Sequence, residues 1–182
     1  MADIHAMLDL ETLGTGSNAF IVQMHIKQFS LDDPKFYGES FTQLIDPWRK
    51  QVGSEIDQST VEWWQERPRE VREAVLSGKE TLTDALQNLN YWLKSSGIKI
   101  DYLWANSPSF DCVILQNAFK RYALEWKLPP YWAWRDMRTV VGLAKQLGAD
   151  LPKLQNTHDA QLDVNNQIDL LKKAFDFINQ RG

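Results

Sequence analysis

The sequence predicts a mixed α/β fold, and three observations carry this prediction. Apolar and β-branched runs follow one another with short polar turns between them, at residues 4–10, 19–29 and 36–45. This pattern is typical of an antiparallel meander of three strands. A fourth, short strand is expected at residues 102–105. Apolar residues at helical spacing surround that fourth strand, so helices should flank the sheet.

Helices are expected wherever apolar residues recur every three or four positions. Four segments show this spacing, at residues 81–94, 110–122, 139–147 and 159–178. Leu162 is expected on the apolar side of the last of these helices. Ser59 and Glu62 resemble a capping box that opens a further short helix, which Pro68 interrupts.

Length and composition indicate one globular domain over residues 1–182. The chain is 43% hydrophobic and 24% charged. Its net charge of −4 argues against a broad basic surface that grips duplex through phosphate neutralisation. The single cysteine, Cys112, allows no internal disulfide and fits a reducing compartment. No apolar run approaches 18 residues and no signal-peptide pattern occurs, so we expect a cytoplasmic protein with no membrane partner.

Two carboxylates stand out near the start of the chain. Asp9 and Glu11 end an apolar run and are two residues apart. Alternate residues of a strand point to the same face, which places these side chains ~7 Å apart. Two carboxylates this close repel each other unless a cation lies between them. A hard divalent ion such as Mg²⁺, held by oxygen ligands, satisfies that requirement.

A further acid, Asp111, follows the expected strand at 102–105 and a polar loop. The loop then lies at the carboxyl end of the sheet, where open α/β sheets build their sites. An aspartate in the first turn of a helix is also a common capping device, so both a functional and a structural role are open.

A histidine and a fourth acid precede and open the last helix. His158 and Asp163 are five residues apart, which on a continuous helix separates them by ~140°. They converge only if His158 lies at the helix entrance and Asp163 lies one turn in. This arrangement suits a general base beside a metal ligand, although a lone histidine is more often a packed or surface residue.

Taken in order along the chain, these motifs resemble the DEDDh branch of the DnaQ-like 3′→5′ exonucleases, which have the ribonuclease H-like fold. Asp9–Thr12, Asn106–Asp111 and His158–Asp163 correspond to the three motifs of that family. The resemblance extends to a narrower group that includes a phage exonuclease A and a mycobacterial exoribonuclease, through Trp63-Trp64 and residues 135–139. Ser107 stands where a glycine is expected in that group.

The resemblance implies a metal-dependent 3′→5′ exonuclease that releases nucleoside 5′-monophosphates from single strands or 3′ overhangs. It implies two divalent ions, Mg²⁺ or Mn²⁺, ~3.5–4 Å apart. Asp9, Glu11, Asp111 and Asp163 would hold them, and His158 would take a proton from the attacking water. A mixed sheet, with the antiparallel meander joined to parallel strands, follows from the same resemblance.

Residues near these acids are expected to bind the substrate. Candidates are Thr12, Leu13, Gly14, Trp64 and Asn106. Leu13 either wedges against the last base or is a turn residue. Of the Trp63-Trp64 pair, either one side chain packs in the core and the other faces the cleft for base stacking, or both pack in the core. Arg135 and Arg138 could share one helical face and either bind phosphate or pair with nearby acids.

Two other functions stay open: a ribonuclease H-like endonuclease, and a nucleic-acid-binding module without catalysis. The second requires a lost ligand, and all five motif residues are present. The partner is the 3′ end of a nucleic acid, and the residues do not decide between RNA and DNA. The aromatic run Tyr131–Trp134 is either a core plug or an exposed surface for a homodimer.

Overall fold

The protein, described by a computed structural model over residues 3–33, 35–97 and 99–181, is built around one mixed five-stranded sheet. The strand order is β3-β2-β1-β4-β5. The first three strands pair antiparallel, and β4 and β5 join parallel to β1. The strands are β1 His5–Thr12, β2 Ile21–Phe29, β3 Tyr37–Leu44, β4 Tyr102–Ala105 and β5 Trp134–Asp136.

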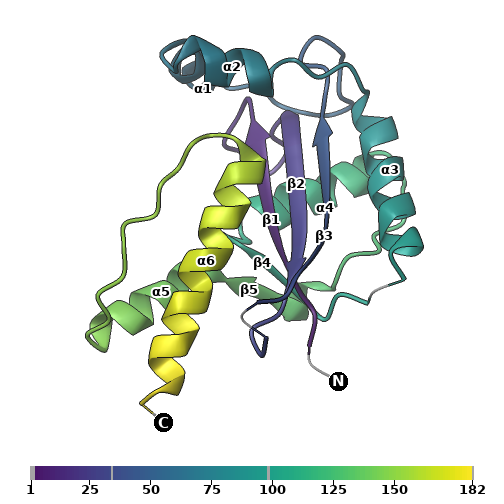
Figure 1. The fold of residues 1–182 in the computed structure, drawn as a ribbon. Helices are drawn as coiled ribbons and strands as arrows, with labels where there is room; N and C mark the ends of the chain where they lie inside the picture. The colour runs from purple at the N-terminus through teal and green to yellow at the C-terminus, as the bar shows by residue number, and fades with distance from the viewer. Residues whose placement is uncertain (1–2, 34, 98, 182) are drawn as a thin grey trace.

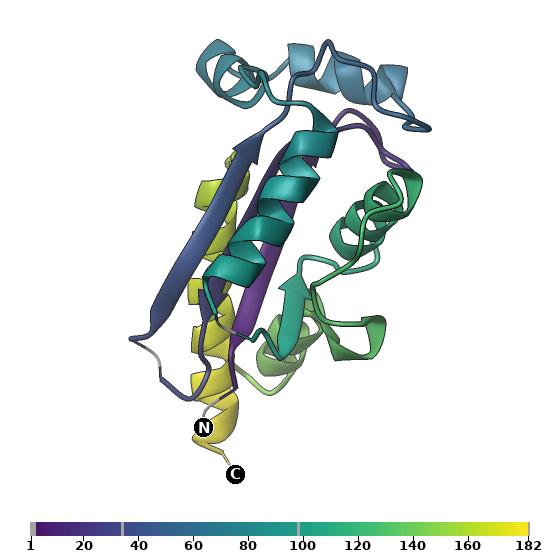
Figure 2. The ribbon, with the colours of Figure 1, turned by 90° about the vertical axis from the view of Figure 1, so that its right-hand side faces the viewer.

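Helices cover both faces of the sheet (Figures 1 and 2). The helices are α1 Gln58–Gln65, α2 Arg69–Val75, α3 Leu82–Ser95, α4 Asp111–Arg121, α5 Met137–Gln146 and α6 Ala160–Asn179. α3 and α4 pack in one apolar core with Leu8 and Ile26, and α5 and α6 pack in a second core with Met7 and Phe29. Because alternate residues of β1 enter opposite cores, the central strand is buried on both sides.

Helices α1 and α2 lie beyond the end of the sheet to which β1 points (Figure 1). They enclose a third, smaller core made of Leu13, Phe20, Val22, Trp64 and Val75. The loop after β1 and the start of α1 therefore meet at the carboxyl end of β1. Among the described residues, none of the helices has the length and apolar character needed to cross a bilayer.

The predicted meander and mixed sheet are confirmed, and β4 has the predicted bounds. Three short elements escaped prediction: β5, which has three residues, α2, which has seven and follows Pro68, and a 3₁₀ helix over Tyr131–Ala133. Short elements carry too few residues to show a hydrophobic period. The arginines Arg135 and Arg138 consequently lie on different elements, β5 and α5, and do not share a helical face.

Two predicted details of the helices were wrong. The N-cap residue of α1 is Asp57 and not Ser59, and the carboxylate of Asp57 instead accepts hydrogen bonds from the backbone and hydroxyl of Thr15. Leu162 is 52% exposed, because the first turn of α6 buries Asp163 and Val164 instead. The polar residue is buried there because this turn faces the cluster of acids described below.

One glycine between α2 and α3 allows a close backbone approach, and its substitution tests the packing. A Cβ atom at Gly78 would lie 2.5 Å from backbone atoms of Ile45, whereas one at Gly142, within α5, would meet no atom within 4 Å. We expect Gly78→Ala to lower the free energy of unfolding by about 1–3 kcal/mol. Gly142→Ala should raise it by up to about 1 kcal/mol, through helix propensity alone. Urea titrations measure both, and equal stability of the two variants would contradict the close approach.

Candidate active site

Asp9 and Glu11 extend from the same side of β1 at its carboxyl end. The strand continues two residues past its predicted end, with an irregularity between Glu11 and Thr12. Glu11 is only 9% exposed. Asp9 accepts a hydrogen bond from Nε2 of Gln167 in α6 at 2.8 Å. The alternation predicted from the sequence therefore brings both carboxylates to one place.

Asp111 reaches the same place from the neighbouring strand. It is the first residue of α4 and follows β4 through the loop that begins at Asn106. Its Oδ1 accepts a hydrogen bond from the backbone N–H of Leu10 at 3.1 Å. Since Leu10 lies between Asp9 and Glu11, this bond ties the third carboxylate to the strand that carries the first two. In the loop, the Ser107 hydroxyl lies 2.6 Å from that of Ser109.

Asp163 and His158 converge because the chain folds back before α6. Asp163 lies in the first turn of α6, and its Oδ1 accepts hydrogen bonds from the backbone N–H and the hydroxyl of Thr157, at 2.7 and 2.8 Å. Its Oδ2 accepts from the backbone N–H of His158 at 3.0 Å. His158 has a φ of 59°, in the left-handed region. The predicted histidine at the helix entrance and acid one turn in are both observed.

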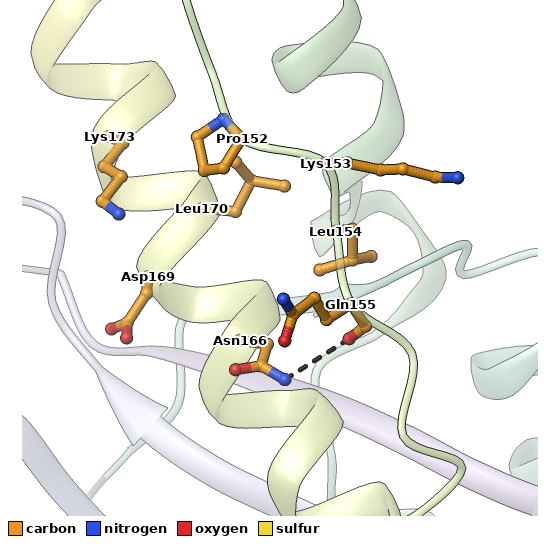
Figure 3. A pocket seen from close by; sticks show the side chains of 8 residues that line it. All are labelled: Pro152, Lys153, Leu154, Gln155, Asn166, Asp169, Leu170 and Lys173. Carbon is orange, nitrogen blue, oxygen red and sulfur yellow. Dashed lines mark hydrogen bonds between the residues drawn. The ribbon is translucent and has the colours of Figure 1, made fainter.

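The loop that leads to His158 is also held against α6 farther from the acids. Figure 3 shows residues 152–155 running beside the helix, with Nδ2 of Asn166 donating to the backbone carbonyl of Gln155 at 3.3 Å. A shallow pocket of about 180 Å³ separates this segment from α6. The loop is therefore attached to the helix at two points, which limits where the His158 side chain can lie.

The five predicted residues line one pocket of about 290 Å³. Ligand atoms of Glu11, His158 and Asp163 lie within 4.8 Å of one another. Six other residues complete the lining: Leu10, Asn106, Phe110, Arg138, Asn156 and Gln167. The tertiary structure thus assembles carboxylates from β1, α4 and α6, together with one imidazole, around a small space.

Burial and mutual repulsion dominate the electrostatics of this pocket. Burial, followed by repulsion from Asp9 and Asp163, raises the pKa of Glu11 to about 9. Burial likewise raises the pKa of Asp9 to about 7, against the hydrogen bond from Gln167. The pKa of Asp111 lies well above its usual range, again mainly through burial. A divalent cation removes this penalty, and an all-oxygen carboxylate set is what Mg²⁺ or Mn²⁺ prefers. The residues present therefore fit such an ion.

His158 has the opposite shift. Burial lowers the pKa of its imidazole, and Arg67 lowers it further, whereas Asp163 raises it. The edge of the His158 ring packs against Trp63, with ring centroids 4.6 Å apart. The guanidinium of Arg67 lies over the ring of Trp63, with its Cζ atom 4.4 Å from the ring centroid. Burial thus favours the neutral form of this imidazole, which lines the carboxylate pocket.

A second pocket, of about 380 Å³, adjoins the first and shares Leu10, Glu11 and Phe110 with it. Of the predicted substrate-binding residues, Thr12, Gly14 and Trp64 line it, and Asn106 lines the carboxylate pocket. Leu13 lines neither of these two pockets, because its side chain is buried in the third core. The backbone and side chains after β1 thus form one wall of this second pocket.

The two adjacent tryptophans have different environments. Trp64 is 2% exposed, and its indole N–H donates to the backbone carbonyl of Thr12 at 2.9 Å. Trp63 is only partly buried and faces His158. Of the two predicted alternatives, a core and a partly exposed tryptophan are observed, and Trp63 has more exposed surface than Trp64, the predicted substrate-binding residue. Sequence alone cannot choose between neighbours on a helix, because the choice depends on the direction in which α1 packs.

Gln167 and Arg138 were not among the predicted site residues. Gln167 lies four positions after Asp163, so helical periodicity places it on the same face, and this signal could have revealed it. Arg138 was considered for phosphate binding without a location. No local pattern places it in the pocket, because its partner Asn106 is 32 residues away.

Fold and site together define a DnaQ-like exonuclease domain with the ribonuclease H-like architecture. The chain matches, over residues 4–175, the model of the family described as the 3′-5′ exoribonuclease Rv2179c-like domain. It belongs to this family. No curated protein matches its sequence significantly.

Several solved structures share the fold. Cell-death related nuclease 4 (CRN-4) superposes with a TM-score of 0.67 at 17% identity, covering 98% of this chain and 64% of that one. The product-bound structure of exonuclease I gives 0.65 at 14% identity, over 99% and 46% of the two chains. The zinc-bound complex of E. coli ExoI with single-stranded DNA gives 0.63 at 16%, over 98% and 43%. The chain therefore spans less than two thirds of these relatives.

The contrast between the tryptophans predicts different effects on stability. Trp64→Phe leaves the buried carbonyl of Thr12 without its donor, so we expect it to lower the free energy of unfolding by about 1–3 kcal/mol. The matched change Trp63→Phe removes an indole N–H with no buried acceptor and should cost less. Thermal and urea unfolding of both variants measure the difference. A larger loss for Trp63→Phe would contradict the assignment of Trp64 to the core.

Proposed function

We propose that this protein is a metal-dependent 3′→5′ exonuclease that releases nucleoside 5′-monophosphates from single-stranded or 3′-overhang nucleic acid. The observation that carries the proposal is the convergence of four carboxylates and His158, from three separate segments, in one pocket. Membership of a family described as 3′-5′ exoribonucleases supports the reaction class. That description favours RNA, whereas the exonuclease I structures named above include one with single-stranded DNA, so both polymers are candidate substrates.

Two divalent ions, Mg²⁺ or Mn²⁺, are part of this proposal. Asp9, Glu11, Asp111 and Asp163 would hold them, because these four carboxylates line one pocket and, among the described residues, none of them forms an ion pair. When bound, the ions would stabilise negative charge on the scissile phosphate and increase the acidity of a nearby water. The titles of the structural relatives include a zinc-bound form, which supports divalent-metal use in this fold without defining the metal here.

The protein's own groups have separate tasks in this reaction. The imidazole of His158 accepts a proton from the attacking water, whose oxygen bonds to phosphorus as the P–O3′ bond breaks. Asp163 orients His158 by accepting its backbone N–H, and Trp63 packs against the ring. The pocket beside Glu11, lined by Thr12, Gly14 and Trp63, has room for the terminal nucleotide, and Trp63 offers a surface for stacking.

We further propose a single exonuclease domain over residues 1–182 in a reducing, cytoplasmic compartment, where the unpaired and buried Cys112 is stable.

The aromatic residues 131–134 differ in exposure. Tyr131 and Trp132 are 70% and 69% exposed, whereas Trp134 packs against a core. A homodimer through the two exposed rings stays a prediction, and sedimentation of Trp132→Ala beside the wild type tests it.

Metal binding is measurable without catalysis. We expect saturating Mn²⁺ or Mg²⁺ to raise the Tm of the wild type by roughly 5–10 °C, because a ligand that binds only the folded state stabilises it. Asp9→Asn should lose most of this increase, and the control Asp150→Asn, an exposed carboxylate outside the pocket, should keep it. An equal increase in all three proteins would show that the ions bind elsewhere.

Digestion of 5′-labelled RNA and DNA oligonucleotides tests the reaction. The wild type should produce a ladder of shortened products that requires Mg²⁺ or Mn²⁺ and disappears with EDTA. Asp9→Ala should nearly abolish cleavage, and His158→Ala should reduce the rate by ~10²–10⁴-fold while the metal-dependent rise in Tm remains. Cleavage of a closed circular substrate would favour an endonuclease. Metal binding without cleavage of any substrate would favour a non-catalytic binding module.

A further inference from the structure

Arg138 is an uncompensated cation in a pocket of carboxylates. It enters from the first turn of α5, where the N-cap residue Asp136 accepts its backbone N–H at 2.8 Å. Its side chain lines the pocket that contains Asp9 and Asp111. Within the part of the chain that the structure describes, Arg138 is the only lysine or arginine in the lining of this pocket and forms no ion pair.

The guanidinium of Arg138 is oriented by a neutral partner. Its Nε donates to Oδ1 of Asn106 at 3.0 Å, and its Nη2 donates to the backbone carbonyl of the same residue at 2.8 Å. A guanidinium has five N–H donors in a rigid plane, so two are used and three are left. Among the described residues, these three have no protein acceptor. The group is therefore fixed in direction and retains its full charge.

An anionic ligand fits this arrangement better than a structural role alone. Arg138 is exposed, so its unused donors can reach a ligand from solvent. Its charge lowers the pKa of the nearby Asp111 carboxyl only as a minor effect beside burial. A phosphodiester that enters the pocket must approach four carboxylates, and a planar guanidinium can donate two hydrogen bonds to one phosphate.

The position of Arg138 relative to the two pockets indicates which phosphate it meets. The pocket with room for the terminal nucleotide adjoins Glu11 on one side, and Asn106 and Arg138 line only the carboxylate pocket. If the 3′ nucleotide occupies the pocket beside Glu11 and the scissile phosphate lies at the carboxylates, the rest of the strand continues past Arg138. We infer that Arg138, positioned by Asn106, binds a backbone phosphate on the 5′ side of the scissile bond. This inference rests on the proposed exonuclease function.

A neutral linkage tests the contact directly. Single methylphosphonate linkages replace the first or the second phosphate on the 5′ side of the scissile bond in a 5′-labelled oligonucleotide, and single-turnover removal of the 3′ nucleotide is measured. We expect the wild type to slow by roughly 10- to 100-fold at one of these linkages, as for a hydrogen bond to a charged group. Arg138→Gln should be slower by a similar factor on the unmodified strand and show no further loss at that linkage.

Two variants accompany Arg138→Gln. Arg135→Gln is the matched control, because it removes the same charge three residues away, where the guanidinium stacks over Tyr102 at 4.4 Å. It should keep the full penalty at the modified linkage. Arg138→Lys keeps the charge but loses the fork to Asn106, so it should retain only part of the penalty. If Arg138→Gln has a lower Tm than the wild type, the linkage penalty of Arg138→Lys still tests the contact.

The inference fails if Arg138→Gln and Arg138→Lys keep the same linkage penalty as the wild type at both positions. It also fails if no linkage matters to the wild type. The exonuclease function fails separately, if the wild type with Mg²⁺ or Mn²⁺ does not shorten the unmodified strand at all.

Discussion

The gathering of four carboxylates in one pocket, three of them buried, is the constraint on which the rest of this structure depends. Asp111 and Asp163 are 3% and 5% exposed, and Glu11 is 9% exposed, so water screens them poorly. Burial of unpaired carboxylates costs free energy unless each is hydrogen-bonded and a cation is near. Hydrogen bonds within the fold hold Asp9, Asp111 and Asp163, and among the described residues Arg138 is the one arginine or lysine that lines the pocket.

Three of the four carboxylates are held by different parts of the fold. Backbone N–H groups bond Asp111 and Asp163, and the Gln167 amide bonds Asp9. These bonds run between β1, α4 and α6, so the same contacts that orient the acids also join the central strand to helices on opposite faces of the sheet. The site and the packing of the domain are therefore coupled.

We propose that groups at the rim of the pocket select the substrate. Trp63 and the segment after β1 form a wall of one pocket, and the Arg138 guanidinium offers positive charge in the adjoining carboxylate pocket. A net charge of −4 provides no general attraction for a polyanion. Under the proposed function, groups in and beside the pocket must then bind the nucleic acid. Such local binding suits a protein that binds the end of a strand better than one that binds along a duplex.

The sequence by itself predicted the longer elements and the five acidic and histidine candidates that line one pocket, whereas short elements such as β5 and α2 escaped it. Alternation on β1 and helical spacing on α6 are local patterns, and Asp9, Glu11 and Asp163 follow from them. Only the tertiary structure decided that Trp63 packs closer to the His158 ring than Trp64 does, with ring centroids 4.6 and 6.4 Å away, and that Arg138 bonds Asn106. The bond from Gln167 to Asp9 spans 158 residues. Such contacts depend on strand order and helix packing, which no local period encodes.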